Sequence, residues 1–180
     1  MPEKLFEPMV FVDLETTGAT GTVDRITEIG IVEVNEEGEV REWSSLVNPQ
    51  TSIPPFIQNL TGISDAMVAE APTFEELAEE VLMRLHGRLF VAHNARFDYG
   101  FLKNEFKRVG VDFKATVLCT VKLSRKLFPQ FSKHSLDALI ERHQLHMPAR
   151  HRALADAAVL WQFWQILQQQ MPASQLQEAV

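Results

Sequence analysis

Cysteine is nearly absent from this chain of 180 residues, which contains only Cys119. A single cysteine excludes an intramolecular disulfide bond and a zinc site with several cysteine ligands. Long apolar runs are also lacking: the longest unbroken one has five residues, 157–161, whereas a bilayer span needs about 20. Residues 1–5 have neither the charged start nor the apolar stretch of a signal peptide. We therefore expect a cytoplasmic protein with no membrane contact.

Positive charge is scarce in the first half of the chain. Residues 1–95 carry 17 acidic and 5 basic side chains, whereas residues 96–152 carry 5 acidic and 12 basic ones, and the formal net charge is −7. Such a chain does not coat nucleic acid indiscriminately, because phosphate binding is mainly electrostatic. The basic segment, with Lys122, Arg125 and Lys126, could hold a short stretch of phosphate backbone. Solvated charges scattered over exposed surfaces are the alternative.

Hydropathy patterns predict the fold class. A length of 180 residues favours one domain, which we place at residues 1–170 with a short tail at 171–180 that is expected to fray. The patterns predict strands at 9–15, 26–34, 39–47, 88–92 and 117–120, and helices at 73–85, 97–109, 134–143 and 152–169. Strands that first follow one another and then alternate with helices indicate an α/β fold with a mixed sheet covered by helices.

Two acidic residues interrupt the first predicted strand. Asp13 and Glu15 are two positions apart, so their side chains point to the same face. Burying an unpaired carboxylate costs several kcal/mol, and residues 5–24 contain no Lys or Arg to pair with it. A divalent cation resolves this conflict, because Mg²⁺ and Mn²⁺ prefer oxygen ligands. A strand end with two solvated acids is the alternative.

Two further polar clusters lie at predicted element boundaries. Residues 93–98, His-Asn-Ala-Arg-Phe-Asp, follow an apolar strand, and Asp98 could be a ligand or a simple helix cap. Residues 151–156, His-Arg-Ala-Leu-Ala-Asp, open an apolar helix in which Asp156 is a misfit unless it is paired. His151 titrates near neutrality, as a general base must, although a surface or capping histidine is the plainer interpretation. Glu28, within an apolar strand, could support the site from behind its ligands, although a solvated strand position is the favoured interpretation.

Together the three clusters resemble the motifs of the DnaQ-like 3′→5′ exonucleases of the DEDD superfamily, in its histidine-bearing branch. The likeness is strongest to the proofreading exonuclease domain of the epsilon subunit of bacterial DNA polymerase III. The motifs are Asp-x-Glu-Thr-Thr-Gly from Asp13, the 93–98 cluster and the 151–156 cluster, in that order. Segments 60–63, 119–120 and 134–139 match as well, so the resemblance runs from about residue 9 to residue 168. It implies an RNase H-like fold with a mixed five-stranded sheet flanked by helices.

The resemblance also implies roles for individual residues. Asp13, Glu15, Asp98 and Asp156 would hold two divalent cations, Mg²⁺ or Mn²⁺, which clamp the attacking and leaving oxygens of an in-line displacement at phosphorus. His151 would take a proton from the attacking water, and we expect the nearby carboxylates to raise its pKa. Substrate contacts are expected at Thr16, Leu60, Thr61 and Asn94, although a structural turn is an equal alternative for Asn94. The implied product is a nucleoside 5′-monophosphate, released from the 3′ end.

Other functions remain open at the level of the sequence. The preferred substrate is the 3′ end of single-stranded DNA, in proofreading or end trimming, and an RNA-directed relative such as an oligoribonuclease is the alternative. Other classes are an inactive nucleic-acid-binding module and a polymerase-assembly subunit. Intact acids and His151 favour an enzyme over the binding module. No long extension follows the last predicted helix, which favours a stand-alone enzyme over one bound to a polymerase.

Overall fold

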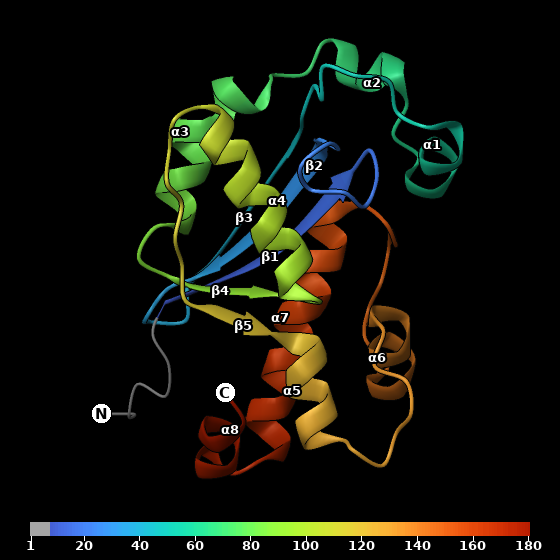
Figure 1. Ribbon diagram of the computed structural model, residues 1–180. Helices are drawn as coiled ribbons and strands as arrows, with labels where there is room; N and C mark the ends of the chain where they lie inside the picture. The colour runs from blue at the N-terminus through green and yellow to red at the C-terminus, as the bar shows by residue number, and fades with distance from the viewer. Residues whose placement is uncertain (1–7) are drawn as a thin grey trace.

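The strand that carries the first acidic pair, β1 (Met9–Thr16), lies in the middle of the sheet (Figure 1). In the computed structural model, which describes residues 8–180, the strand order is β3-β2-β1-β4-β5. β2 (Ile26–Val34) and β3 (Val40–Leu46) pair antiparallel, and β4 (Leu89–Ala92) and β5 (Val117–Cys119) extend the sheet in parallel. The predicted mixed five-stranded sheet is confirmed. The prediction for residues 1–5 lies outside the described residues.

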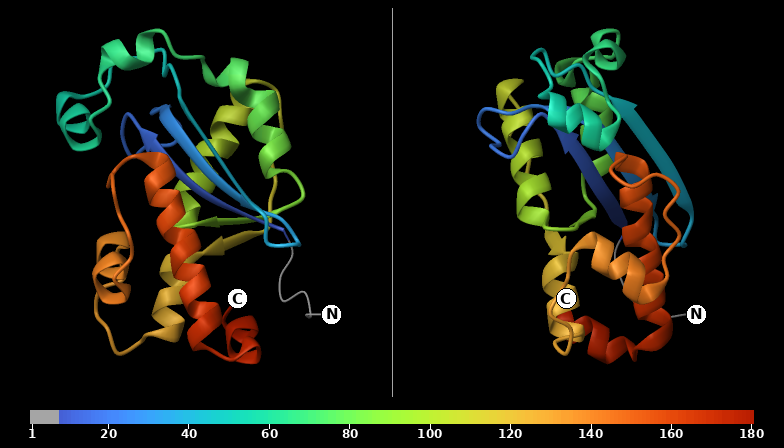
Figure 2. Two further views of the ribbon diagram at one scale, coloured as in Figure 1. Left: turned by 180° about the vertical axis from the view of Figure 1, so that it is seen from behind. Right: turned by 90° about the vertical axis from the view of Figure 1, so that its right-hand side faces the viewer.

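Helices cover both faces of this sheet, which lies between α4 and α7 in the right-hand view of Figure 2. The helices of residues 8–180 are α1 (Pro55–Thr61), α2 (Asp65–Ala69), α3 (Phe74–Leu85), α4 (Ala95–Arg108), α5 (Thr120–Leu127), α6 (Leu136–His143), α7 (Ala153–Gln170) and α8 (Ala173–Ala179). Within the described part of the chain, no helix combines the length and apolar character that a membrane span requires.

The alternation of side chains along β1 assigns its two faces. Val10 and Val12 belong to the apolar core that α3 and α4 cover, whereas Met9 and Phe11 pack in the second core, which contains α7. Because strand side chains alternate, Asp13 and Glu15 continue the row begun by Met9 and Phe11. That row leads to the N-terminal end of α7.

The C-terminal segment departs from the sequence-based prediction. Residues 171–180 were expected to form a fraying tail, but they contain α8, whose Leu176 is buried in the core of α7. Met171 and Ala179 pack against the same core, and α8 contacts both α5 and α7, so tertiary packing orders this short helix. The other helices absent from the prediction are α1, α2 and α5.

Candidate active site

Three carboxylates from the two ends of the chain meet at the end of β1. The structure brings Asp13 and Glu15 together with Asp156, from the first turn of α7, so that one ligand oxygen of each lies within 4.8 Å of the others. The predicted same-face arrangement of Asp13 and Glu15 is therefore confirmed. A β-bulge between Glu15 and Thr16 ends the regular pairing of β1 with β2 directly after this pair.

Asp98 approaches the same place from the opposite side. It lies in the first turn of α4, is buried, and is close enough to Asp13 for its charge to raise the pKa of that carboxyl. Burial also raises the pKa of Asp98 itself, although its own backbone N–H and that of Leu14 lower it by hydrogen bonding. Asp98 is thus a neighbour of the three-carboxylate group and does not belong to its 4.8 Å cluster.

The electrostatics of this group fit a divalent cation. Burial, and then repulsion by the other carboxylates, raises the pKa of Asp13 well above its usual range and that of Glu15 to about 8. Burial also raises the pKa of Asp156 to about 6. Among the described residues, the buried Oδ2 of Asp13 has no hydrogen-bond partner. A hard cation with oxygen ligands would satisfy this atom and offset the repulsion, so the residues present fit Mg²⁺ or Mn²⁺.

His151 lies in the turn that precedes α7 and has a left-handed backbone conformation, with φ of 67°. Its backbone N–H donates to Asp156 Oδ1 over 3.3 Å. Arg150 donates to Asp156 Oδ2 at 2.6 Å and lies 3.4 Å from His151 Nδ1. The expectation of a raised pKa for His151 is wrong: desolvation, followed by the charge of Arg150, lowers it. The lowered pKa of His151 favours the neutral imidazole, the form that accepts a proton.

Glu28 supports the site, so the favoured interpretation of it as a solvated strand residue is wrong and the alternative of a supporting residue holds. It is buried on β2, and its carboxylate accepts hydrogen bonds from Arg152, the shortest at 2.6 Å, and from the backbone N–H of Ala153 at 2.8 Å. Gly30, two residues along the same strand, leaves room for α7, since a β-carbon there would lie 2.3 Å from the backbone nitrogen of Leu154. Glu28 thus fixes the start of α7, next to His151.

A cleft of about 540 Å³ opens from the carboxylates toward α5 and α6. Asn94 is exposed at its edge and, with φ of 65°, also makes the left-handed turn between β4 and α4, so both roles considered for it are compatible. Lys122 and Arg125 line the cleft. Lys126 does not, and its Nζ instead donates to a carbonyl oxygen of α8 at 3.4 Å. The structure therefore separates the three basic residues that the sequence grouped together.

The remaining predicted substrate contacts lie outside this cleft. Thr16 is buried and donates its hydroxyl hydrogen to Gly18 O at 2.6 Å. Leu60 projects from α1 and is more than half exposed. Thr61 is buried, and its hydroxyl donates to Ile57 O at 2.9 Å within the helix, which leaves only its backbone for a ligand. The structure thus offers Leu60 as an exposed side chain, whereas the side chains of Thr16 and Thr61 are buried and hydrogen-bonded within their own segments.

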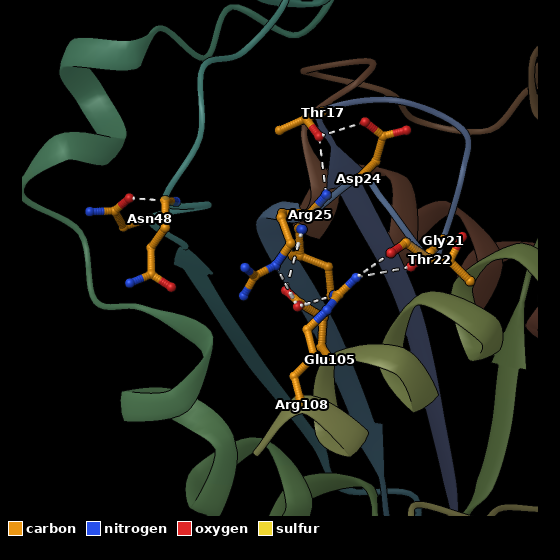
Figure 3. A network of polar contacts seen from close by, with 10 residues as sticks. Thr17, Gly21, Thr22, Asp24, Arg25, Asn48, Glu105 and Arg108 are labelled. Atoms are coloured by element: carbon orange, nitrogen blue, oxygen red, sulfur yellow. Dashed lines mark hydrogen bonds and ion pairs between the residues drawn. The ribbon is translucent and has the colours of Figure 1, made fainter. Parts of the chain in front are cut away.

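Residues 17–25, the loop that follows the acidic strand, are held to α4 by a buried carboxylate. Glu105 accepts hydrogen bonds from Arg25 Nε at 2.7 Å and from Arg108 at 2.5 Å (Figure 3). Arg108 also donates to the carbonyl oxygen of Thr22 at 3.1 Å. Because α4 carries the second motif as well, Glu105 fixes the first motif relative to the second. Glu105 lies within α4, and no pattern in the sequence predicted that this charged residue would be buried.

His93 directly follows β4, and both of its ring nitrogens have hydrogen-bond partners. Its Nε2 lies 2.8 Å from the carbonyl oxygen of His134, which can only accept, so Nε2 carries the proton. Nδ1 lies 2.8 Å from the hydroxyl oxygen of Thr120, whose single hydrogen can go to this nitrogen or to the carbonyl oxygen of Ala92 at 3.2 Å. Burial lowers the pKa of His93 to about 4. This side chain supports the floor of the cleft and is not suited to act as a base.

The buried ring of His93 predicts a loss of stability in acid. The unfolded chain has a histidine pKa of about 6.5, so between pH 6.5 and 4 the unfolded state binds a proton that the folded state does not, and acidification destabilises the fold. We expect wild type to lose about 2 kcal/mol more than His93→Gln between pH 7.5 and 5, measured by urea unfolding in EDTA. The exposed His86, changed to Gln, is the control and should keep the wild-type loss. Equal losses in wild type and His93→Gln would contradict the assignment.

Comparison with known proteins identifies the family of this chain. The exonuclease family model (RNase_T) matches residues 10–164. The chain belongs to this exonuclease family. The 3′-5′ exonuclease DinG of Bacillus subtilis is 46% identical over 153 residues, and DNA polymerase III PolC-type of Caldanaerobacter subterraneus is 40% identical over 148. These matches cover 83% and 82% of this chain but only 16% and 11% of the two relatives, which are far longer.

Solved structures of exonucleases share the fold of this family member. Exonuclease X in complex with 5′ overhanging duplex DNA superposes with a TM-score of 0.70 at 30% identity, covering 95% of this chain and 98% of that one. A complex of E. coli exonuclease I with single-stranded DNA gives 0.82 at 17% identity, covering 93% of this chain and 41% of that one, a likeness of fold alone. The predicted DnaQ-like resemblance is confirmed.

Proposed function

We propose that this exonuclease domain hydrolyses phosphodiester bonds at the 3′ ends of single-stranded DNA and releases nucleoside 5′-monophosphates. The observation that carries the proposal is the meeting of Asp13, Glu15 and Asp156 around a buried carboxylate oxygen that lacks a protein partner within residues 8–180. The name of one relative, 3′-5′ exonuclease DinG, supports the direction, and the complex of exonuclease X with duplex DNA that has a 5′ overhang supports DNA as the nucleic acid.

Each group then has a chemical task. Asp13, Glu15, Asp98 and Asp156 would hold two divalent cations, which supply charge stabilisation to the attacking and leaving oxygens. His151, kept neutral by burial and by Arg150, accepts the proton of the attacking water. Glu28 and Arg152 hold the start of α7, so that His151 and Asp156 keep their positions.

The terminal nucleotide and the rest of the strand lie on different sides of the carboxylates in this proposal. The backbone at Thr16 and the side chain of Leu60 receive the terminal nucleotide without reading base edges, so sequence preference is weak. The strand on the 5′ side of the scissile bond occupies the cleft with Lys122 and Arg125.

A comparison of labelled oligomers tests the function. DNA and RNA, single- and double-stranded, labelled at the 5′ end, are incubated with Mg²⁺, Mn²⁺ or EDTA. The proposal expects a ladder that shortens from the 3′ end of single-stranded DNA, with mononucleotides bearing a 5′-phosphate as products, in Mg²⁺ or Mn²⁺ only. Faster turnover of RNA would show that RNA, and not DNA, is the preferred substrate. Binding without cleavage under every condition would favour an inactive nucleic-acid-binding module.

The placement of Lys122 and Arg125 predicts a change in salt dependence. Each phosphate contact on a single strand contributes about 0.7 to the slope of log K against log salt, so neutralising both residues should make the slope shallower by about 1.4. Binding of an oligothymidine measured by fluorescence anisotropy at several salt concentrations gives this slope.

The matched control removes the same charge elsewhere. Lys126 contacts α8 and Lys114 is an exposed residue paired with Asp112, so neither lines the cleft. The variant with both changed to Ala should keep the wild-type slope. A shallower slope in this control, with no change on loss of Lys122 and Arg125, would move the phosphate-binding surface to another face.

A further inference from the structure

Beyond the carboxylates, a second cavity adjoins the cleft. It has a volume of about 540 Å³ and is lined by Phe131, Ser132, Lys133, Ala138, Glu141 and Arg142. Ser132 lines both cavities, so the second continues the path that begins at Asp13 and passes Lys122 and Arg125. It lies between the loop that joins α5 to α6 and the surface of α6.

Phe131 is the aromatic residue of this second cavity and is 44% exposed. The guanidinium group of Arg142 lies 4.3 Å from the centre of its ring, a cation–π contact that covers part of the aromatic surface. The exposed part of the Phe131 ring therefore lies next to two basic side chains, those of Arg142 and Lys133. The same combination is what single-stranded nucleic acid binds, because every base has a face that can stack.

The loop that carries Phe131 is fixed before any ligand arrives. Arg142 donates to the carbonyl oxygen of Lys133 at 2.6 Å and to Ser124 Oγ at 3.1 Å. The ring of His134 bridges Ser124, at 2.7 Å, and the carbonyl oxygen of Phe131, at 2.9 Å. These contacts order the backbone on both sides of the aromatic ring. A preorganised ring binds a base with a smaller entropic cost than a mobile one.

We propose that Phe131 is a base-stacking platform for single-stranded DNA, on the 5′ side of the scissile bond. This inference rests on the proposed function, because the direction of the strand comes from it. A base stacks on the exposed part of the Phe131 ring, and the cations of Lys133 and Arg125 lie along the same path to meet the neighbouring phosphates. Continuity with the cleft favours a nucleic-acid strand over an apolar partner, and so does the lining of the second cavity, in which Lys133 and Arg142 outnumber the single acid, Glu141.

Single abasic positions test the platform. An oligothymidine with one abasic nucleotide, moved stepwise from the 3′ end, is titrated in Mg²⁺ into protein carrying Asp98→Ala, with and without Phe131→Ala, and followed by anisotropy. Base–aromatic stacking is worth about 5- to 150-fold in affinity. We expect the abasic nucleotide to cost this much at one position upstream of the terminal nucleotide. At that position Phe131→Ala should remove the cost, so that the two changes are not additive.

Variants that keep the bulk of the side chain separate stacking from packing. Phe131→Tyr and Phe131→Trp should restore the cost of the abasic position, whereas Phe131→Leu should not. Met83→Ala, which removes a side chain 71% exposed on α3, is the control. The abasic nucleotide should cost this variant as much affinity as it costs protein with an unchanged Phe131. Thermal unfolding of each variant checks folding, and Phe131→Leu serves in place of Phe131→Ala if the latter is unstable.

Two results would overturn the platform. One is that the losses of affinity caused by Phe131→Ala and by the abasic nucleotide are additive at every position. The other is that Phe131→Leu shows the same cost of the abasic nucleotide as protein with Phe131. Failure of the proposed function is a different result: no cleavage by wild type together with intact coupling between Phe131 and one base. Cleavage without coupling would reject the platform alone.

Discussion

Changing Asp13 to Ala is expected to lower turnover on single-stranded DNA by about 10³-fold or more. The loss corresponds to several kcal/mol of transition-state stabilisation that the bound cations supply, at about 1.4 kcal/mol for each factor of ten. Asp13 carries the buried oxygen that lacks a partner among residues 8–180, and its ligand oxygen lies within 4.8 Å of those of Glu15 and Asp156. Steady-state rates with a 5′-labelled oligomer in Mg²⁺ and in Mn²⁺ measure the effect.

Stability distinguishes loss of a cation site from loss of the fold. Since burial and repulsion disfavour the charge of Asp13, its removal should leave the Tm in EDTA unchanged or higher. Added Mn²⁺ should raise the Tm of wild type, because a ligand that binds only the folded state stabilises it, and should raise that of Asp13→Ala much less. Asp112→Ala, an exposed acid, is the control. Full turnover by wild type after removal of all divalent cations would refute the two-cation proposal.

Periodicity was enough to predict part of the site. The spacing of Asp13 and Glu15 on a strand places both on one face, because side chains alternate along a strand whatever the rest of the fold does. Periodicity could not predict that Asp156 would lie beside Asp13 and Glu15, since α7 lies at the other end of the chain. Only the ordered set of motifs connected the two, through a family resemblance.

The interpretation of Glu28 as a solvated strand residue was wrong for a physical reason. All nine residues of β2 are buried, because β1 and β3 flank the strand and helices cover both of its faces. A charged residue in such a strand needs a partner, and the partner here is Arg152, which the sequence gives no means of pairing with it. Burial with an ion pair from a distant segment therefore looks, in sequence, like a solvated position.

The overlooked helices have local causes. β5 has only three residues and α5 begins at the next one, so no loop marks the boundary, and the apolar run was interpreted as a strand alone. α2 has only five residues, which is too short for helical periodicity to show. Two of the residues proposed to bind the strand, Lys122 and Arg125, lie on α5. The prediction of a basic segment was thus correct in composition but could not say which of its charges share a surface.

Changing His151 to Ala is expected to lower turnover by about 10²- to 10⁴-fold, the usual contribution of a positioned acid–base group. Four carboxylates are available for two hard cations, which prefer oxygen, so an imidazole ligand is unnecessary. Burial and the charge of Arg150 keep the ring neutral, which is the form that accepts a proton. Removal of this ring should therefore abolish proton transfer while the affinity for Mn²⁺ stays nearly unchanged. Rates with labelled oligomers and calorimetric Mn²⁺ titrations measure the two quantities separately.

Rescue by a small base separates a chemical role from a structural one. Added imidazole should restore part of the turnover of His151→Ala, since it can accept the proton in place of the missing ring, and it should do nothing for Asp13→Ala, which lacks a carboxylate. His146→Ala is the matched control, because the bonds between His146 and Gln162 involve only the histidine backbone, and it should retain wild-type rates. If His151→Ala instead loses a Mn²⁺ site by calorimetry, then His151 is a ligand, the carboxylates alone do not complete the centre, and the proton must leave by another group.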